Sequence, residues 1–495
     1  MSELYTKLGF ESNPFETFSA ENETQVLNQF YIPPRRYNTI TRAMHNNVSN
    51  YIFAKRGNGK TALLYSLIND LDVKNSLHIV IDDFSKINIS KDKVELSFLK
   101  LTIKKFVETL IFRLINNKNI LDKCNNVVKR NEIATIIFSY LDTISKESYI
   151  NEVERIKGTY TKNNFKKFFN NYLINVANSL ASATLDMLST TISNALGMQS
   201  FLSDKEHKYI KSLKIDNLED ISSYSDIKLI FDKLISLIRE LGFTTITIFV
   251  DRVDEYSELE NFPIKISEFI HPISGNTVLT NDTRFSFQFL LWDKLKEPMA
   301  KLGVRFDKVT QISIDLKVEE LENIMKERLK YYSSGKITNL ESIIDIKPSL
   351  IFELADSSPR NMFRLLFTVY NLQEDSAIEN INRITENAFE DGFNDYIYEY
   401  NFYYDYPMNS NQEKFTVYEF IGNLYALKKT YFTIKEYTEA CHLTPAQTKK
   451  QIEKMLEMNV ISRLMSEGEY KYQVVSKLLT YAINRNKNIK GINSI

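Results

Sequence analysis

The stretch Ala54-Lys55-Arg56-Gly57-Asn58-Gly59-Lys60-Thr61 constrains the fold of this 495-residue chain more than any other. The chain has 13 glycines in all, and two of them stand two positions apart here. An apolar run at 51–53 precedes the stretch, and a helical pattern begins at Thr61 and Ala62. Glycine tolerates positive φ and lets a ligand approach the backbone, so this order predicts a phosphate-binding loop between a strand and a helix.

The residue order of this loop assigns a role to most positions. The stretch fits the Walker A pattern with alanine in first place. Backbone N–H groups from Gly57 to Lys60 would point at phosphate oxygens, Lys60 would neutralise the β- and γ-phosphates, and Thr61 would bind Mg²⁺. We therefore predict ATP and Mg²⁺ as ligands; a chance glycine-rich turn is the alternative. The predicted nucleotide-binding residues of the loop are Ala54, Arg56, Gly57, Asn58, Gly59, Lys60, Thr61 and Ala62.

An acidic stretch, Asp251-Arg252-Val253-Asp254-Glu255, follows a strand pattern at 244–250. A carboxylate at the end of a strand beside a phosphate loop can hold the metal, and a further acid can polarise the attacking water. We predict that Asp251 is a metal ligand together with Thr61. Asp254 or Glu255 is the predicted water-activating acid, and the residues alone do not separate the two. The alternative is a plain strand followed by an acidic helix start.

These two motifs resemble those of P-loop ATPases of the AAA+ and STAND classes. The spacing of Asp251, Asp254 and Glu255 is similar to the Walker B motif of NACHT proteins and other STAND ATPases. Arg252 stands where most AAA+ enzymes have a catalytic glutamate. The resemblance implies an ATPase that hydrolyses slowly, or a pseudo-ATPase scaffold if Arg252 disables hydrolysis.

Two arginines extend the resemblance. The stretch Ser357-Ser358-Pro359-Arg360 is similar to the lid motif of AAA+ proteins and origin-recognition ATPases, which implies that Arg360 is a sensor 2 residue reaching the γ-phosphate. Arg305 precedes the strand pattern at 310–314, the place from which many AAA+ proteins project an arginine finger into a neighbouring subunit. A helix start with a surface arginine and a solvated arginine are the respective alternatives.

The sequence gives weaker indications of the adenine pocket and of the sensor 1 residue. A segment at 31–37 resembles the one that lines the adenine pocket of origin-recognition ATPases, which makes Pro33 and Tyr37 candidates for contact with the base. A plain proline-rich turn is the alternative. The strand pattern at 285–291 is followed by Trp292 and Asp293, which leaves the sensor 1 position unassigned.

Strand patterns alternate with helical ones along the chain, which predicts an α/β fold with a mainly parallel sheet covered on both faces. We expect a P-loop core of the AAA+ type with a large helical insertion, a helical lid and a C-terminal winged helix. The expected boundaries are 1–90 and 241–316 for the core, 91–240 for the insertion, 317–400 for the lid and 411–490 for the winged helix.

The last unit is predicted from three helical patterns and two short strand patterns at 415–480, an order that also ends the chain of origin-recognition ATPases. Thr444-Pro445-Ala446-Gln447 is a capping box with proline at N1, so it starts the third helix. Basic residues are in excess over 431–490, although the net charge of the whole chain is −1. In a winged helix the third helix would enter a DNA groove with Gln447, Lys449, Lys450 and Lys454 along it.

Composition excludes several other classes. With 43% hydrophobic and 25% charged residues, the chain should bury ordinary cores. Cys124 and Cys441 are too far apart to indicate a disulfide framework or a zinc site. No run reaches the ~18–20 apolar residues needed to cross a bilayer, so we expect a cytoplasmic protein without membrane contact. The run at 179–201 comes nearest, and we interpret it as a buried or interface helix.

Two hypotheses follow. In the first, the chain is a switch governed by ATP and ADP that forms a homo-oligomer and engages double-stranded DNA through the winged helix. In the alternative, it is a STAND-like signalling ATPase, for example in antiviral defence, in which ATP controls assembly with a protein partner that binds the helical insertion.

Overall fold

The computed structural model describes residues 4–72, 74–116, 120, 222–376, 382–408, 416–466 and 469–492. Most of the expected insertion at 91–240, including the run at 179–201, therefore lies outside the described residues. Within the described ranges, every helix falls short of the length and apolar character that a membrane crossing requires.

A five-stranded sheet forms the centre of the molecule, with strand order β2-β3-β4-β1-β5 and every pairing parallel. The strands are β1 (Asn50–Ala54), β2 (Ser76–Ile81), β3 (Thr245–Val250), β4 (Ser286–Trp292) and β5 (Thr310–Ile314). Every residue of β1, β3 and β4 is buried, as expected for a parallel sheet with both faces covered. The predicted α/β fold class is confirmed.

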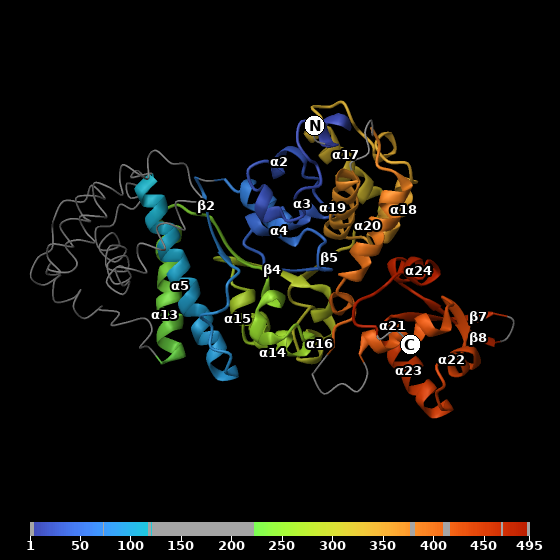
Figure 1. The fold of residues 1–495 in the computed structure, drawn as a ribbon. Coiled ribbons are helices and arrows are strands. Elements are labelled where there is room, and N and C mark those ends of the chain that lie inside the picture. The colour runs from blue at the N-terminus through green and yellow to red at the C-terminus, as the bar shows by residue number, and fades with distance from the viewer. Residues whose placement is uncertain are drawn as a thin grey trace, which may run out of the picture.

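Helices cover the two faces of this sheet (Figure 1). On one face, β1 and β5 share an apolar cluster with α3 (Tyr37–His45), α4 (Lys60–Asn69) and the helices of the lid. On the other face lie α5 (Lys91–Asn116), α13 (Tyr224–Glu240), α14 (Pro263–Ser274) and α16 (Lys296–Lys301). The helices α5 and α13, which flank the undescribed stretch, lie side by side against the sheet (Figure 1).

The lid follows β5 and consists of α17 (Val318–Tyr332), α18 (Pro348–Leu354), α19 (Pro359–Asp375) and α20 (Glu386–Tyr398). The start of α19 has a local cause: the Ser358 side chain accepts a hydrogen bond from the N–H of Asn361, and Pro359 stands at the first helical position. The N-terminal segment, with α1 (Leu4–Lys7), η1 (Ala20–Glu23) and α2 (Leu27–Phe30), packs against these helices.

The C-terminal unit has the element order of a winged helix. Its elements are α21 (Val417–Leu427), β6 (Tyr431–Thr433), α22 (Ile434–Ala440), α23 (Pro445–Glu457), β7 (Ile461–Ser466), β8 (Glu469–Val474) and α24 (Lys477–Asn484). The three strands pair antiparallel in the order β6-β8-β7. The predicted capping box is present, because Thr444 and Gln447 each bond the backbone of the other. Strand β6 was not predicted from the sequence.

The lid and the winged helix share one apolar cluster, which contains side chains from α18, α19, α20, α21 and α24. The rings of Phe393 and Tyr481 meet across the boundary with centroids 4.8 Å apart. Glu390 of α20 accepts a hydrogen bond from the Tyr481 hydroxyl at 2.6 Å and pairs with Lys487 at 2.8 Å. The lid and the winged helix are therefore in direct contact through α20 and α24.

Candidate functional site

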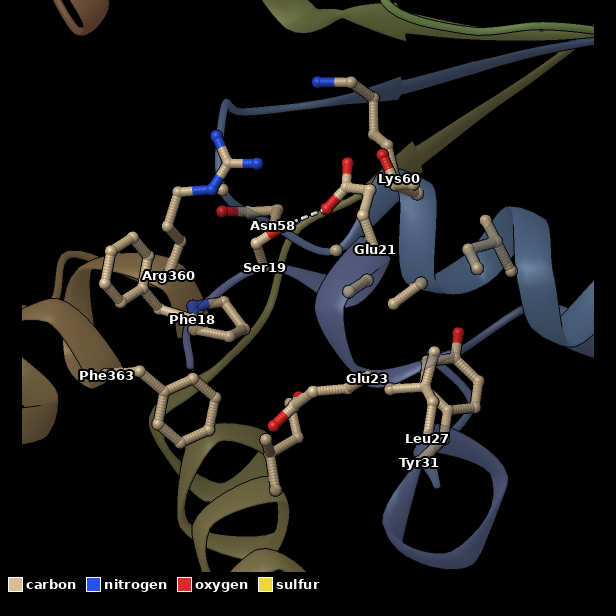
Figure 2. Close-up of a pocket in the computed structure, with 18 of the residues that line it drawn as sticks. Phe18, Ser19, Glu21, Glu23, Leu27, Tyr31, Asn58, Lys60, Arg360 and Phe363 are labelled. Atoms are coloured by element: carbon tan, nitrogen blue, oxygen red, sulfur yellow. Dashed lines mark hydrogen bonds between the residues drawn. The ribbon is translucent and has the colours of Figure 1, made fainter. Parts of the chain in front are cut away.

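A cleft opens at the carboxyl ends of β1 and β3, with about 1120 Å³ of empty space including the part open to solvent. Its walls come from the loop after β1, the N-terminal segment and the start of α19 (Figure 2), and from the turn after β3. Of the residues predicted from the sequence, those that line it are Arg56, Gly57, Asn58, Gly59, Lys60, Thr61, Ala62, Asp251, Asp254, Glu255 and Arg360. The structure thus brings both motifs and the lid arginine to one place.

The loop between β1 and α4 has the backbone that its glycines allow. Gly57 and Gly59 have φ values of 81° and 79°, and Gly59 is the N-cap of α4. The N–H groups of Lys60 and Thr61 lie in the first helical turn, where no intrahelical carbonyl can accept their hydrogen bonds. A Cβ at Gly57 would lie 2.4 Å from Oγ of Ser358, so this glycine also permits the close approach of the lid. Donors and helix dipole together suit a phosphate.

Thr61 and Asp251 meet at the base of the cleft. The Thr61 hydroxyl donates to Oδ2 of Asp251 at 3.0 Å. Asp251 is 1% exposed, and its Oδ1 has no partner among the described residues. Burial raises the pKa of Asp251 to about 6, against the opposing effects of Lys60 and the Thr61 hydroxyl. An unpaired carboxylate oxygen beside a hydroxyl fits the ligand preferences of Mg²⁺, so these residues suit the predicted metal.

The two acids that the sequence leaves equivalent have different surroundings. Asp254 is 3% exposed, and its Oδ2 accepts a hydrogen bond from Nε of Arg56 at 2.7 Å. Burial acts to raise the pKa of Asp254, but the positive charges of Lys60 and Arg56 outweigh it and lower the pKa. Glu255 is exposed, with Nε of Arg252 3.9 Å from its carboxylate. Asp254 is therefore the acid that is held in place.

Arg252 has a positive φ of 60°, and its guanidinium pairs with Glu21 of η1. Glu21 lines the cleft and also accepts a hydrogen bond from Ser19 (Figure 2). Arg252 thus connects the turn after β3 to the N-terminal segment.

The lid contacts the phosphate loop directly. The backbone N–H of Arg360 donates to the carbonyl of Gly57 at 3.3 Å. Its side chain lines the cleft and extends toward the loop at Asn58 (Figure 2). The position of α19 therefore depends on the same loop that would hold phosphate.

The N-terminal segment, the residues after β5 and the lid together supply an apolar end to the cleft. The residues that line this end are Phe18, Leu27, Phe30, Tyr31, Ile32, Pro34, Leu316, Ile324 and Phe363. The sequence pointed to this segment through Pro33 and Tyr37, which are not among the lining residues. The Tyr37 hydroxyl instead bonds Oγ of Ser66 at 2.9 Å and Oδ2 of Asp70 at 2.7 Å. The apolar and aromatic side chains that line this end of the cleft suit a nucleotide base.

A buried ion pair that the sequence did not indicate joins the N-terminal segment to the lid. Arg328 of α17 is 1% exposed and donates to both carboxylate oxygens of Glu23, at 2.8 and 2.5 Å. It also donates to the carbonyls of Pro14 and Thr17. The Phe363 ring lies 4.5 Å from its guanidinium carbon. Both members of the pair line the cleft.

Arg305 lies apart from these residues and does not line the cleft. Its side chain is 56% exposed and pairs with Asp307, with Nη2 to Oδ2 at 2.7 Å. The arginine-finger role concerns a second subunit and stays a prediction.

The predicted DNA-facing helix, α23, presents Gln447, Lys449 and Lys450 to solvent. Glutamates are interleaved with these cations: Glu453 lies 4.0 Å from Lys449, and Glu457 lies 3.2 Å from Lys454. The wing adds Arg463 over the Tyr470 ring at 4.7 Å and Lys471 over the Tyr431 ring at 5.5 Å.

Comparison with known proteins assigns no family to this chain. No family model matches the chain, and no curated protein matches it. Among solved structures, the crystal structure of Cdc6p from Pyrobaculum aerophilum is similar over 98% of this chain and 99% of that chain, at 10% identity and a TM-score of 0.32. At that TM-score the similarity does not establish a shared activity.

The internal arrangement is more informative. Strand β4 lies between β1, which leads into the phosphate loop, and β3, which leads into Asp251. A phosphate loop and an acidic strand end separated by one parallel strand form the arrangement that the two sequence motifs predict for a P-loop core.

Proposed function

We propose that this chain binds Mg-ATP in the cleft and acts as a nucleotide-gated switch that hydrolyses ATP slowly. The observation that carries this proposal is the convergence of the phosphate loop, the Asp251 carboxylate, an apolar end and a lid arginine on one cleft. In such a site the N–H groups at the start of α4 and the Lys60 ammonium bind the phosphates. The apolar end takes the base, and Arg360 faces the γ-phosphate from the lid.

Bound Mg²⁺ would supply positive charge that neutralises the phosphate oxygens as the γ-phosphoryl group is transferred. Thr61 and Asp251 are the residues that would hold it. Asp254 orients the attacking water and takes its proton. The lowered pKa of Asp254 makes its carboxylate a weak base. The residue after Asp251 is Arg252, which pairs with Glu21 and cannot serve as a second acid. For both reasons the proposed turnover is slow.

The proposed output is the winged helix. ATP between Arg360 and the phosphate loop would favour one lid position, and the contacts of Phe393 and Glu390 with Tyr481 would transmit that position to the winged helix. Its first candidate partner is double-stranded DNA, on the basis of Lys449 and Lys450 on α23.

A protein partner, as in a STAND-like signalling or antiviral ATPase, is the second candidate. It is supported by exposed apolar side chains on the wing, with Met465 at 71% and Tyr470 at 52% exposure. In either case we propose that ATP promotes self-association, with Arg305 reaching the nucleotide of a neighbouring subunit.

Nucleotide binding is tested by calorimetry on Lys60→Ala. Removal of the ammonium should weaken Mg-ATP affinity at least tenfold, equivalent to about 1.4 kcal/mol. The exposed Lys265, which pairs with Glu260 at 2.6 Å, gives the matched control Lys265→Ala, which should bind as the wild type does. An unchanged affinity in Lys60→Ala would contradict the proposal.

A further inference from the structure

Arg56 belongs to the phosphate loop, yet its guanidinium bonds protein groups. Nε donates to Oδ2 of Asp254 at 2.7 Å, and Nη2 donates to the backbone carbonyl of the same residue, also at 2.7 Å. Nη2 further donates to Oδ1 of Asn261 at 2.8 Å. Two bonds to one residue fix both the carboxylate and the backbone of Asp254, a constraint that the planar arginine fork can impose and a lysine cannot.

Two aromatic rings hold the guanidinium from other parts of the fold. The Trp292 ring, at the end of β4, has its centroid 4.2 Å from the guanidinium carbon. The Tyr404 ring, in η7 (Phe402–Tyr404) between the lid and the winged helix, lies 5.0 Å away. Both distances are within the range of cation–π attraction. The Arg56 side chain is only 12% exposed as a result.

This arrangement gives a reason for the buried charge of Asp254. An ionised carboxylate at 3% exposure is costly unless it is paired and hydrogen-bonded, and Arg56 supplies both conditions. The same contacts keep Asp254 at the edge of the cleft and connect it to the segment that leads to the winged helix.

We propose that Arg56 is a positioning residue for ATP hydrolysis: clamped by Trp292 and Tyr404, it holds Asp254 in place and is not itself a phosphate ligand. The inference rests on the proposed function of the cleft. In the reaction, the water oxygen bonds the γ-phosphorus, the bond from phosphorus to the bridging oxygen breaks, and ADP leaves with the electron pair. The water proton passes to the Asp254 carboxylate, whose orientation Arg56 sets.

The experiment measures Mg-ATP affinity and the single-turnover hydrolysis rate separately on the full chain. For Arg56→Gln we expect the rate to fall at least tenfold while the affinity stays within about threefold, because only the transition state uses the orientation of Asp254. Arg56→Lys keeps the positive charge but loses the planar guanidinium, so its hydrolysis rate should lie between that of the wild type and that of Arg56→Gln.

Tyr404 provides a second pair of variants that is independent of the loop, since the residue is 42% exposed and its replacement does not empty a core. Tyr404→Leu should slow hydrolysis a few-fold, and Tyr404→Phe, which keeps the ring, should restore the rate. Lys265→Gln removes a neighbouring exposed ion pair and should leave both measurements unchanged. If Arg56→Gln does not fold, the hydrolysis rates of the two Tyr404 variants test the positioning role of Arg56.

Several outcomes would overturn the inference. If Arg56→Gln loses as much ATP affinity as Lys60→Ala, then Arg56 is a phosphate ligand. An unchanged or increased rate in Arg56→Gln, or equal rates in Tyr404→Leu and Tyr404→Phe, removes the positioning role. A wild-type chain that binds ATP without hydrolysing it overturns the inference and leaves ATP binding intact. A wild-type chain that does not bind ATP overturns the proposed function and the inference with it.

Discussion

The cleft and the exposed face of the winged helix use charge in opposite ways. In the cleft, Arg56 and Arg328 are nearly buried, and each donates hydrogen bonds to more than one residue from distant segments. On the winged helix, Lys449 pairs only loosely with an acid one turn away, and its side chain is 77% exposed. A buried charge is tolerated only with matched partners, whereas an exposed one costs little. The paired charges of the cleft therefore restrict its ligand more strictly than the exposed charges of the winged helix restrict its partner.

The largest effect should come from breaking the buried pair between Arg328 and Glu23. Arg328→Met leaves the Glu23 carboxylate in an apolar site, and we expect a loss of about 3–5 kcal/mol in the free energy of unfolding. Urea denaturation measures it. The matched control on the other surface, Lys449→Met, should change the same quantity by less than about 1 kcal/mol.

A double variant separates the charge from the packing. Glu23→Leu combined with Arg328→Met replaces both charges by apolar groups and should recover much of the lost stability. If Arg328→Met alone costs less than about 1 kcal/mol, the pair is no stronger than a surface pair and the contrast between the two regions fails.

An intermediate effect is expected for DNA binding by α23. Lys449→Ala combined with Lys450→Ala removes two exposed cations and should weaken binding to double-stranded DNA about tenfold at low salt, with the slope of log affinity against log salt reduced by about two. Fluorescence anisotropy over a salt series measures both quantities. Absence of DNA binding by the wild type would favour a protein partner instead.

The fold was more predictable from the sequence than the site. The four strands β1, β3, β4 and β5 were expected within one residue of their observed ends, because a buried parallel strand is a local apolar run. The capping box at Thr444 was likewise found from neighbouring residues. Strand β6 was not predicted, because its three residues are too few to show the alternating pattern of a strand.

The parts of the site that the sequence missed join residues far apart in the chain. Glu23 and Arg328 are 305 positions apart, and the rings around Arg56 come from the end of β4 and from η7. No local pattern encodes such contacts, since they arise only when the lid packs on the sheet. The distinction between Asp254 and Glu255 also needed the fold, because burial rather than residue type separates them.

The smallest effect should come from Arg305, which tests whether an exposed cation can belong functionally to the cleft. Its two bonds to Asp307, at 2.8 and 2.7 Å, lie in solvent, so the two side chains separate easily. Arg305 can therefore leave Asp307 for the phosphates of a neighbouring subunit at little cost. If it does, ATP binds the assembled state more tightly, and by linkage ATP favours assembly.

Sedimentation with ATP, with ADP and without nucleotide measures this coupling. We expect ATP to increase the assembled fraction and Arg305→Ala to reduce that increase a few-fold, whereas Asp307→Asn should enhance it, because the competing carboxylate charge is removed. Lys301, another exposed cation that pairs with Glu297 at 2.7 Å, gives the control Lys301→Ala, which should behave as the wild type. If the mass is the same in all three conditions, Arg305 is a solvated surface residue, like the exposed lysines of the winged helix, and has no part in the cleft.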